Sequence, residues 1–275
     1  MPATLDSILA ATRRRVALAK AAADLRQLGR QAEAHLPRGF ARELRRAGAS
    51  GTAVIAELKK ASPSRGIIRE EFEVERLAGE LHSAGAAALS VLTDEQFFQG
   101  SLQNLRLASS RAPLPCLRKD FIVDEFQLLE SRANCADAVL LIVAALGDSE
   151  LRTLYRGARG LQLDVLCEVH DEAELERALA AEFEMIGVNS RNLRTFEVDL
   201  GTPLRLASRI PAGVLSVAES GIHSGEEVRE LRNAGYRAFL VGESLMKAPQ
   251  PGVALRELLA QSAAAGSGSQ LATGN

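Results

Sequence analysis

The sequence contains few cysteines and few histidines. Its three cysteines, Cys116, Cys135 and Cys167, are odd in number, and no two of them form a C-x-x-C pair. This usage fits a reducing cytoplasm and argues against a disulfide framework. Cys116 and Cys167 lie in apolar runs, where we expect buried, unreactive thiols. The four histidines are scattered without the spacing of metal ligands, so we expect no metal.

The chain also lacks a strong net charge and a long apolar run. Its formal net charge is -2, an even balance that argues against a nucleic-acid partner but allows one local anion site. No apolar run approaches the ~20 residues needed to span a bilayer. Arg13–Arg15 are basic, but Asp6, Asp24 and Glu33 are interspersed, which favours an amphipathic helix over a transit peptide. We therefore expect a cytoplasmic protein with no membrane partner.

Eight short apolar runs recur along the 275 residues, each separated from the next by enough chain for a helix and its loops. Most are apolar on both faces, as parallel strands are when helices cover them. Eight such units in succession favour a (β/α)8 TIM barrel over a doubly wound open sheet. The runs are Thr52–Leu58, Ala86–Leu92, Leu114–Leu117, Ala138–Val143, Asp164–Cys167, Met185–Val188, Gly213–Ala218 and Ala238–Val241.

The segments between these runs are predicted to be helices. Asp171 with Glu174, and Ser224 with Glu227, have the spacing of capping boxes at two helix starts. We expect a single domain over residues 1–275. Within it, residues 1–48 form a helical N-terminal extension with breaks at Gly29 and at Pro37–Gly39, and the small, polar residues 264–275 form a disordered tail.

Charged residues follow several strands directly, at the end where barrel enzymes place their chemistry. Residues two apart share a face of a strand, and Val54, Ala56 and Leu58 form an apolar face for the helices, so Glu57 and Lys59 should face the barrel axis. The same parity turns Lys119, Glu168, Asn189 and Glu219 inward. A purely structural ion-pair network is the alternative, but burying this many charges is costly and the fold does not need them.

Two glycines and one loop indicate a phosphate site. Gly221 follows the seventh run and Gly242 the eighth, where barrels often bind phosphate through backbone N–H groups. Each glycine alone could equally be part of a helix cap. The loop Lys60–Gly66 is long, polar and basic, so Ser62 could donate to a phosphate and the loop could close over a ligand, unless it is an ordinary connection.

Seven ordered segments of the chain match the motifs of one known family. They are Ile55–Gly66, Ser90–Phe98 with Gly100 and Ser101, Leu117–Ile122, Glu168–His170, Asn189–Leu193, Ala218–Ile222 and Val241–Met246. Through them the chain resembles the indole-3-glycerol-phosphate synthase family over nearly its whole length. Three positions depart from the family pattern: Asn192 stands where Asp is common, Gln99 where Gly is common, and Leu58 where a small or β-branched residue is usual. None is a charged catalytic position.

The resemblance implies the conversion of 1-(2-carboxyphenylamino)-1-deoxyribulose 5-phosphate to indole-3-glycerol phosphate, CO₂ and water, without a cofactor. By similarity, Lys119 is the general acid of ring closure and Glu168 the base for the final proton removal. Lys59 contacts the carboxylate or the departing hydroxyl, and which lysine serves the dehydration is left open. Glu57 and Glu219 hold the lysines charged, and Asn189 binds the substrate.

The resemblance also implies the binding residues. The phosphate rests on Ser62, Gly221, Gly242 and the backbone at Glu243, whose side chain can point outward. The remaining predicted substrate contacts are Ser220, Arg191, Phe98, Phe121 and Leu140, the last three forming an apolar bed for the aromatic ring.

Two other functions are compatible with such a barrel. One is a Schiff-base aldolase with Lys119 as nucleophile, although neighbouring glutamates should keep that lysine protonated. The other is a non-catalytic barrel that binds a phosphorylated metabolite. The expected partner is a small phosphorylated substrate, and we expect a monomer or a weak homodimer.

Overall fold

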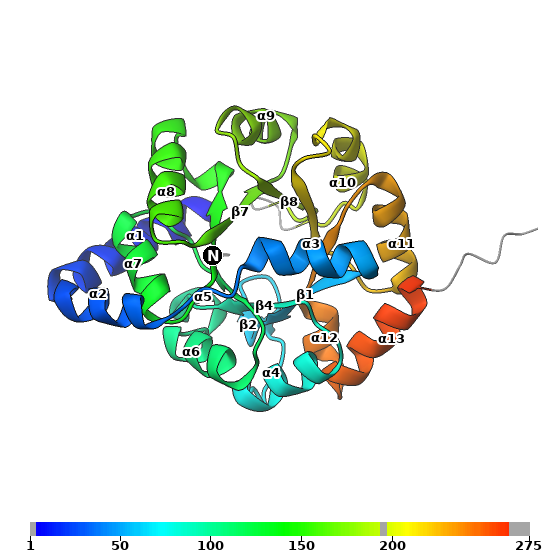
Figure 1. Cartoon of the computed structure of the whole chain (residues 1–275), viewed down its shortest axis with the longest axis horizontal. Coiled ribbons are helices and arrows are strands. Elements are labelled where there is room, and N and C mark those ends of the chain that lie inside the picture. Colours follow the sequence, from blue (N-terminus) through cyan, green and yellow to red (C-terminus); the bar gives the residue numbers. More distant parts are fainter. Residues whose placement is uncertain (1–3, 193–196, 264–275) are drawn as a thin grey trace, which may run out of the picture.

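The computed structural model describes residues 4–192 and 197–263, and eight parallel strands in it close into a barrel (Figure 1). Each predicted apolar run overlaps one strand, which confirms the (β/α)8 barrel. The predicted tail and Leu193 lie outside the described residues. The strands are β1 (Ala53–Leu58), β4 (Ala88–Leu92), β5 (Cys116–Lys119), β6 (Ala138–Ile142), β7 (Asp164–Val169), β8 (Met185–Asn189), β9 (Leu215–Glu219) and β10 (Ala238–Val241).

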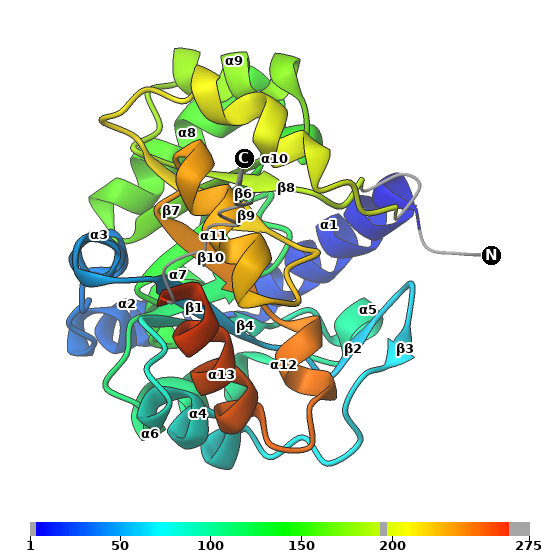
Figure 2. The same cartoon turned by 90° about the vertical axis from the view of Figure 1, so that its right-hand side faces the viewer.

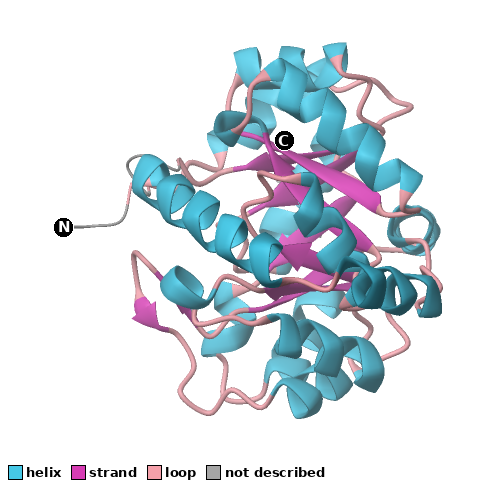
Figure 3. Ribbon diagram, turned by 90° about the vertical axis from the view of Figure 1, so that its left-hand side faces the viewer, coloured by secondary structure: helices cyan, strands magenta, loops and turns pink. Residues whose placement is uncertain are grey.

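Helices follow the strands and surround the barrel (Figure 3). No helix in the described part of the chain is long and apolar enough to cross a membrane. After β1 to β6 come α4 (Val74–Ser83), α5 (Glu95–Phe98), α6 (Leu102–Arg111), α7 (Glu125–Ala133), η1 (Val143–Ala145) and α8 (Asp148–Gly160). After β7 to β10 come α9 (Glu172–Ala180), α10 (Gly201–Leu206), η2 (Ala207–Arg209), α11 (Gly225–Ala234), α12 (Glu243–Lys247) and α13 (Pro251–Ala263).

One of the two predicted capping boxes is present in full. At α11, the Ser224 hydroxyl accepts from the N–H of Glu227, whose carboxylate accepts from the N–H of Ser224. At α9, the Asp171 carboxylate accepts from the N–H of Glu174. The Glu174 carboxylate, however, accepts from the N–H of His170 instead of Asp171, so the second box is only half formed.

Three helices form the N-terminal extension: α1 (Leu5–Ala22), α2 (Leu25–Ala34) and α3 (Phe40–Ser50). The predicted break at Pro37–Gly39 is confirmed, but the break at Gly29 is wrong because α2 runs through it. A glycine costs a helix only about 1 kcal/mol, which packing can outweigh. The chain breaks instead before Asp24, whose carboxylate caps α2 by accepting from the N–H groups of Arg26 and Gln27.

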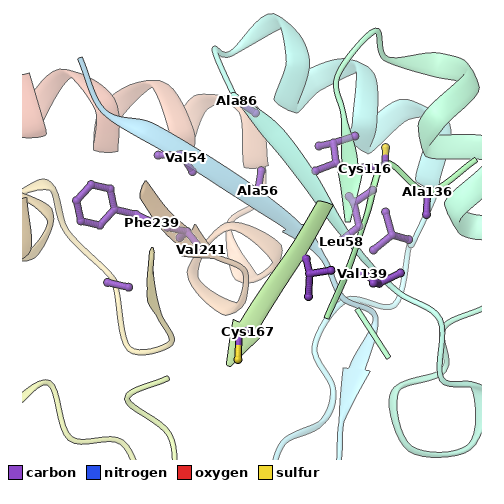
Figure 4. Packing of buried hydrophobic residues seen from close by; sticks show 14 of the residues in the cluster. Val54, Ala56, Leu58, Ala86, Cys116, Ala136, Val139, Cys167, Phe239 and Val241 are labelled. Carbon is purple, nitrogen blue, oxygen red and sulfur yellow. The ribbon is translucent and has the colours of Figure 1, made fainter. Parts of the chain in front are cut away.

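Two apolar layers lie on the two faces of the barrel strands. Val54, Ala56 and Leu58 belong to the outer layer, which packs between the strands and the helices (Figure 4). Ile55, in contrast, belongs to the layer inside the barrel, together with Leu166 and Val217. The predicted facing of β1 is therefore confirmed, and the interior parity continues to the carboxyl ends of the strands.

The extension reaches both ends of the barrel. Phe40 and Leu44 of α3 are fully buried in the interior layer with Ala53, the first residue of β1. Ile8 of α1 joins the same layer with Phe121, which follows the carboxyl end of β5. Figure 2 shows α3 and the free end of α1 on opposite sides of the barrel. The extension thus covers the amino ends of the strands with α3, which we call the floor of the barrel, and flanks their carboxyl ends with α1.

A buried aspartate anchors this extension to the barrel. Asp137, just before β6, accepts from Arg38 Nη2 at 2.6 Å and from the Arg38 N–H at 2.7 Å. His35 Nε2 lies 3.2 Å from the same carboxylate. Burial would raise the pKa of Asp137, but these hydrogen bonds lower it. The hydrogen bond to Asp137 in turn raises the pKa of His35 to about 9, so the anchor is an ion pair at neutral pH.

Candidate active site

A cavity of about 380 Å³ opens at the carboxyl ends of the strands. Every residue predicted for the site lines it, although these residues come from eight separate stretches of the chain. The lining residues that the sequence predicted are Glu57, Lys59, Ser62, Phe98, Lys119, Phe121, Leu140, Glu168, Asn189, Arg191, Glu219, Ser220, Gly221, Gly242 and Glu243.

Lys119 lines the cavity and contacts two glutamates. Its Nζ donates to Glu168 Oε2 at 2.9 Å and lies 3.7 Å from Glu219 Oε2. Burial would lower the pKa of Lys119, but the nearby carboxylates, Glu168 first among them, outweigh burial and raise that pKa. Lys119 is therefore a stable ammonium group that can give up its proton only to a strong acceptor.

The two glutamates beside Lys119 differ in their ionisation. Burial would raise the pKa of Glu168, but the charge of Lys119 and contact with His170 lower it. For Glu219, burial and the negative charge of Glu168 act in the same direction and raise its pKa well above the usual range. Like charges this close cannot both be retained cheaply, so the negative charge favours Glu168 and the proton favours Glu219.

Lys59 forms the second ion pair, with Glu57 Oε1 at 2.6 Å. Two glycines make room for the buried acids. A Cβ on Gly242 would overlap the Glu57 carboxylate, and a Cβ on Gly187 would overlap that of Glu219. Gly242 was predicted for its backbone approach to phosphate, and its lack of a side chain also determines where Glu57 lies.

His170 was not among the predicted site residues. Its Nε2 lies 3.2 Å from Glu168 Oε1, and its Nδ1 lies 2.9 Å from Glu174 Oε2. Two sequence signals could have found it. It is two residues beyond Glu168, so the same strand parity turns it inward, and it is four residues before Glu174, the distance of one helical turn.

The predicted phosphate end of the cavity combines a hairpin with two strand ends. Ser62 lies in the hairpin of β2 (Ala61–Ser62) and β3 (Gly66–Ile67). Gly221 has φ +75°, a backbone conformation that favours glycine. Helix α12 begins at Glu243, and N–H groups in a first helical turn have no partner within the helix, which suits an anion.

The side chain of Glu243 turns toward cations at the rim of the cavity. Its carboxylate lies 3.4 Å from Arg65 Nε, 3.4 Å from Arg191 Nη2 and 2.6 Å from Lys247 Nζ. Arg65 comes from the hairpin and Arg191 from the segment after β8. The Glu243 carboxylate therefore links the hairpin to the segment after β8. The sequence predicted only that this side chain can point outward, and it did not predict these ion pairs.

Asn189 and the apolar residues complete the lining. The N–H of Arg191 donates to Asn189 Oδ1 at 2.9 Å, which fixes the amide so that its NH₂ group is available to a ligand. Phe121 and Leu140 are buried, and Phe98 is half-buried at the end of α5. These three residues form an apolar wall beside the ion pairs.

A second feature missed by sequence reasoning is the contact of the extension with the site. Arg15 of α1 lies 3.1 Å from Asp120 Oδ1, and Asp120 directly follows Lys119. Asp120 also accepts from Arg118 at 2.9 Å. No group of three or more His, Cys, Asp or Glu side chains in the described residues is arranged to hold a metal ion.

Solved structures with the same fold include proteins that act on phosphorylated compounds, as their names state. A 3-hexulose-6-phosphate synthase has a TM-score of 0.62 at 14% identity, over 76% of this chain and 99% of its own. A thiamine phosphate pyrophosphorylase from Pyrococcus furiosus has a TM-score of 0.56 at 17% identity, over 76% and 94%. Identities this low show the fold alone.

Sequence comparisons are much closer. An indole-3-glycerol phosphate synthase from Koribacter versatilis is 56% identical over 259 residues, covering 94% of this chain and all of that protein. Another from Polaromonas naphthalenivorans is 49% identical, covering 94% and 98%. The family model for indole-3-glycerol phosphate synthase matches residues 5–258. The chain therefore belongs to the indole-3-glycerol phosphate synthase family.

Proposed function

We propose that this chain closes 1-(2-carboxyphenylamino)-1-deoxyribulose 5-phosphate to indole-3-glycerol phosphate, with loss of CO₂ and water, as a carboxy-lyase of tryptophan biosynthesis. Family membership supports the reaction. The observation that carries the residue roles is Lys119 held by Glu168 and Glu219 inside the cavity, with the Lys59–Glu57 pair beside it.

Lys119 is the general acid of ring closure. As the aromatic carbon attacks the ketone carbon, negative charge develops on the ketone oxygen, and the Lys119 ammonium donates a proton to it. Its raised pKa keeps the proton available at neutral pH. A Schiff-base aldolase would need Lys119 as a neutral amine, and the raised pKa disfavours that form. This supports Lys119 as an acid and not as a nucleophile.

Loss of CO₂ follows from ring closure, which changes the geometry of the ring carbon that carries the carboxylate. Attack makes the ring carbon that carries the carboxylate tetrahedral, and the bond to CO₂ breaks as the ring becomes aromatic again, so no cofactor is required. Departure of the new hydroxyl as water then needs a proton given to that hydroxyl by Lys59 or Lys119, and removal of a proton from the adjacent carbon. Glu168, held as a carboxylate, takes that proton. Lys59 contacts the substrate carboxylate or the departing hydroxyl, oriented by Glu57.

The substrate phosphate lies between the hairpin and α12 in this proposal. The Ser62 hydroxyl and the N–H groups at Gly221, Gly242 and Glu243 donate to its oxygens. Asn189, Ser220 and Arg191 bind the hydroxyl groups or the carboxylate. Phe98, Phe121 and Leu140 pack against the aromatic ring.

We also propose that the protein works in the cytoplasm, as a monomer or a weak homodimer. Free thiols support a reducing compartment: Cys116, Cys135 and Cys167 are all unpaired with one another. Sedimentation velocity over a range of protein concentrations measures the oligomeric state.

The activity is tested by following indole fluorescence after adding the synthetic substrate. Wild-type protein should form product, and Lys119→Ala and Glu168→Gln should each lower kcat by about 10²–10⁴-fold, the usual contribution of acid–base catalysis. Lys20→Ala is the matched control, since Lys20 is exposed and lies outside the cavity. Absence of product from wild-type protein would overturn the function, and undiminished turnover in both variants would overturn the assigned roles.

A further inference from the structure

We propose that His170 is a positioning residue that selects Glu168, and not Glu219, as the ionised base of the site. This inference rests on the proposed function. Its starting point is a symmetry in the cavity: two buried glutamates approach the same ammonium group, Lys119, at 2.9 Å and 3.7 Å. Lys119 alone therefore favours Glu168 only by a difference in distance.

A second cation removes this near-equivalence. His170 Nε2 lies 3.2 Å from Oε1 of Glu168, while Lys119 contacts Oε2, so each oxygen of Glu168 faces a positive partner. Both Glu219 oxygens and Glu168 Oε1 are buried without a hydrogen bond among the described residues, so the His170 contact with Glu168 is an ion-pair contact. Glu219 has one cation within ion-pair distance in the described part of the chain, Lys119 at 3.7 Å, whereas Glu168 has two. His170 therefore adds to the preference that Lys119 already gives to Glu168.

His170 is itself held in one orientation. Its Nδ1 lies 2.9 Å from Glu174 Oε2, and its backbone N–H donates to the same oxygen at 2.8 Å. Burial would lower the pKa of His170, but Glu168 and Glu174 raise it to about 10. The imidazole is therefore a fixed cation through the neutral pH range.

The charged groups that face Glu168 come from several elements. Glu168 on β7 faces Lys119 from β5, Glu219 from β9 and His170 from its own strand end, while Glu57 lies across the site on β1. His170 faces Glu168 and Glu174 of α9. His170 is not one of the described residues that line the cavity, and its ring contacts Glu168 and Glu174. We therefore assign it a role that acts through Glu168.

Loss of the His170 charge should let the proton move between the two glutamates. Glu168 would then be ionised only at higher pH, because an opposite charge at this distance lowers a carboxyl pKa by about 1–3 units. A base works only when it is ionised. The acidic limb of the kcat/KM profile should therefore move toward higher pH, and activity should recover there.

The experiment compares His170→Asn with wild-type protein across pH. The acidic limb of kcat/KM should move up by about 1–3 pH units, with activity approaching that of wild type on the alkaline side. Glu174→Gln should move the limb in the same direction by a smaller amount, since His170 keeps one carboxylate. His82→Asn is the control, because His82 is an exposed histidine on α4. Recovery at high pH separates positioning from a general loss of structure.

Infrared titration of the unliganded protein gives a second readout that needs no turnover. Comparison with Glu168→Gln assigns the Glu168 carboxylate band, and His170→Asn should protonate this group at a higher pH than wild type. An unmoved limb and band in His170→Asn would overturn the inference while leaving the enzyme activity intact. If wild-type protein forms no product, the proposed function fails and the infrared result still decides the ionisation. If His170→Asn does not fold, an unmoved limb and band in Glu174→Gln overturn the inference.

Discussion

At the scale of single residues, the site depends on where side chains are missing as much as on where they are present. Glu57 and Glu219 occupy the volume that a Cβ on Gly242 or Gly187 would fill. Sequence parity predicted which side chains face the cavity, because the pleat alternates strictly. It could not predict which oxygen meets which cation, since that depends on the register between strands. His170 carries sequence signals in its spacing to Glu168 and Glu174, but which oxygen of Glu168 it contacts depends likewise on the fold.

Gly242→Ala should impair catalysis without unfolding the barrel. The added methyl group must displace the Glu57 carboxylate and, with it, Lys59. Misplacement of a catalytic group by about 1 Å can cost about 10²-fold, so we expect kcat/KM to fall by that order. The measurement is steady-state kinetics beside Gly213→Ala, where a new Cβ meets open space. Unchanged kinetics in Gly242→Ala would mean that Glu57 does not need its present position.

At the scale of elements, apolar patterning located all eight strands, since strands buried on both faces read as continuous apolar runs. The strand boundaries were predicted less closely: β5 spans Cys116–Lys119, whereas the predicted apolar run spans Leu114–Leu117. The run stops at Leu117 because the next residue, Arg118, is charged although it lies inside β5. It points away from the barrel axis and is fully buried, held by Asp120 and Glu130, both at 2.9 Å. One partner, Glu130, lies twelve residues away on α7, and the spacing of Arg118 and Asp120 alone does not indicate that both are buried.

Gly29→Ala should stabilise the protein. Gly29 lies inside α2 with nothing near the position of a new Cβ, so alanine adds helix propensity without a clash. We expect the free energy of unfolding to rise by about 0.5–1 kcal/mol. Urea denaturation measures this change. Gly39→Ala should have the opposite sign, because Gly39 has φ +78°. Destabilisation by Gly29→Ala would contradict a regular helix through this residue.

Arg118→Met should destabilise the barrel strongly. Methionine fills similar volume but leaves Asp120 and Glu130 without their shared cation. Breaking a buried pair in this way costs about 3–5 kcal/mol. Chemical denaturation of this variant is best compared with Arg14→Met, an exposed position where a change within about 0.5 kcal/mol is expected. Equal stability of the two variants would refute a stabilising role for this network.

At the scale of the whole molecule, the extension contacts the barrel at both ends of its strands. Asp137 anchors Arg38 and His35 near the floor, and Arg15 reaches Asp120 beside the catalytic lysine. The sequence predicted the helices of this segment but not their path. The contacts of Arg15 with Asp120 and of Arg38 with Asp137 depend on the closed barrel. The hydrophobic periodicity of the extension therefore does not predict them.

The anchor makes stability depend on pH in a defined direction. The pKa of His35 is raised from 6.5 to about 9, so its ion pair contributes fully below pH 6.5 and is lost as pH rises through about 9. Wild-type protein should therefore exceed His35→Gln in unfolding midpoint at pH 6, and the difference should shrink by pH 9.5. Urea midpoints at both pH values test this. A constant difference would place the stabilisation in packing and not in charge.

Helix α3 packs against the starts of both β1 and β10, two strands that lie about 185 residues apart in the chain. Its binding surface on the barrel therefore forms only when β10 has joined β1, although α3 precedes every barrel strand in the sequence. Until that closure, Phe40 and Leu44 stay exposed to water. Refolding experiments should accordingly find Phe40 and Leu44 buried no earlier than β10 pairs with β1.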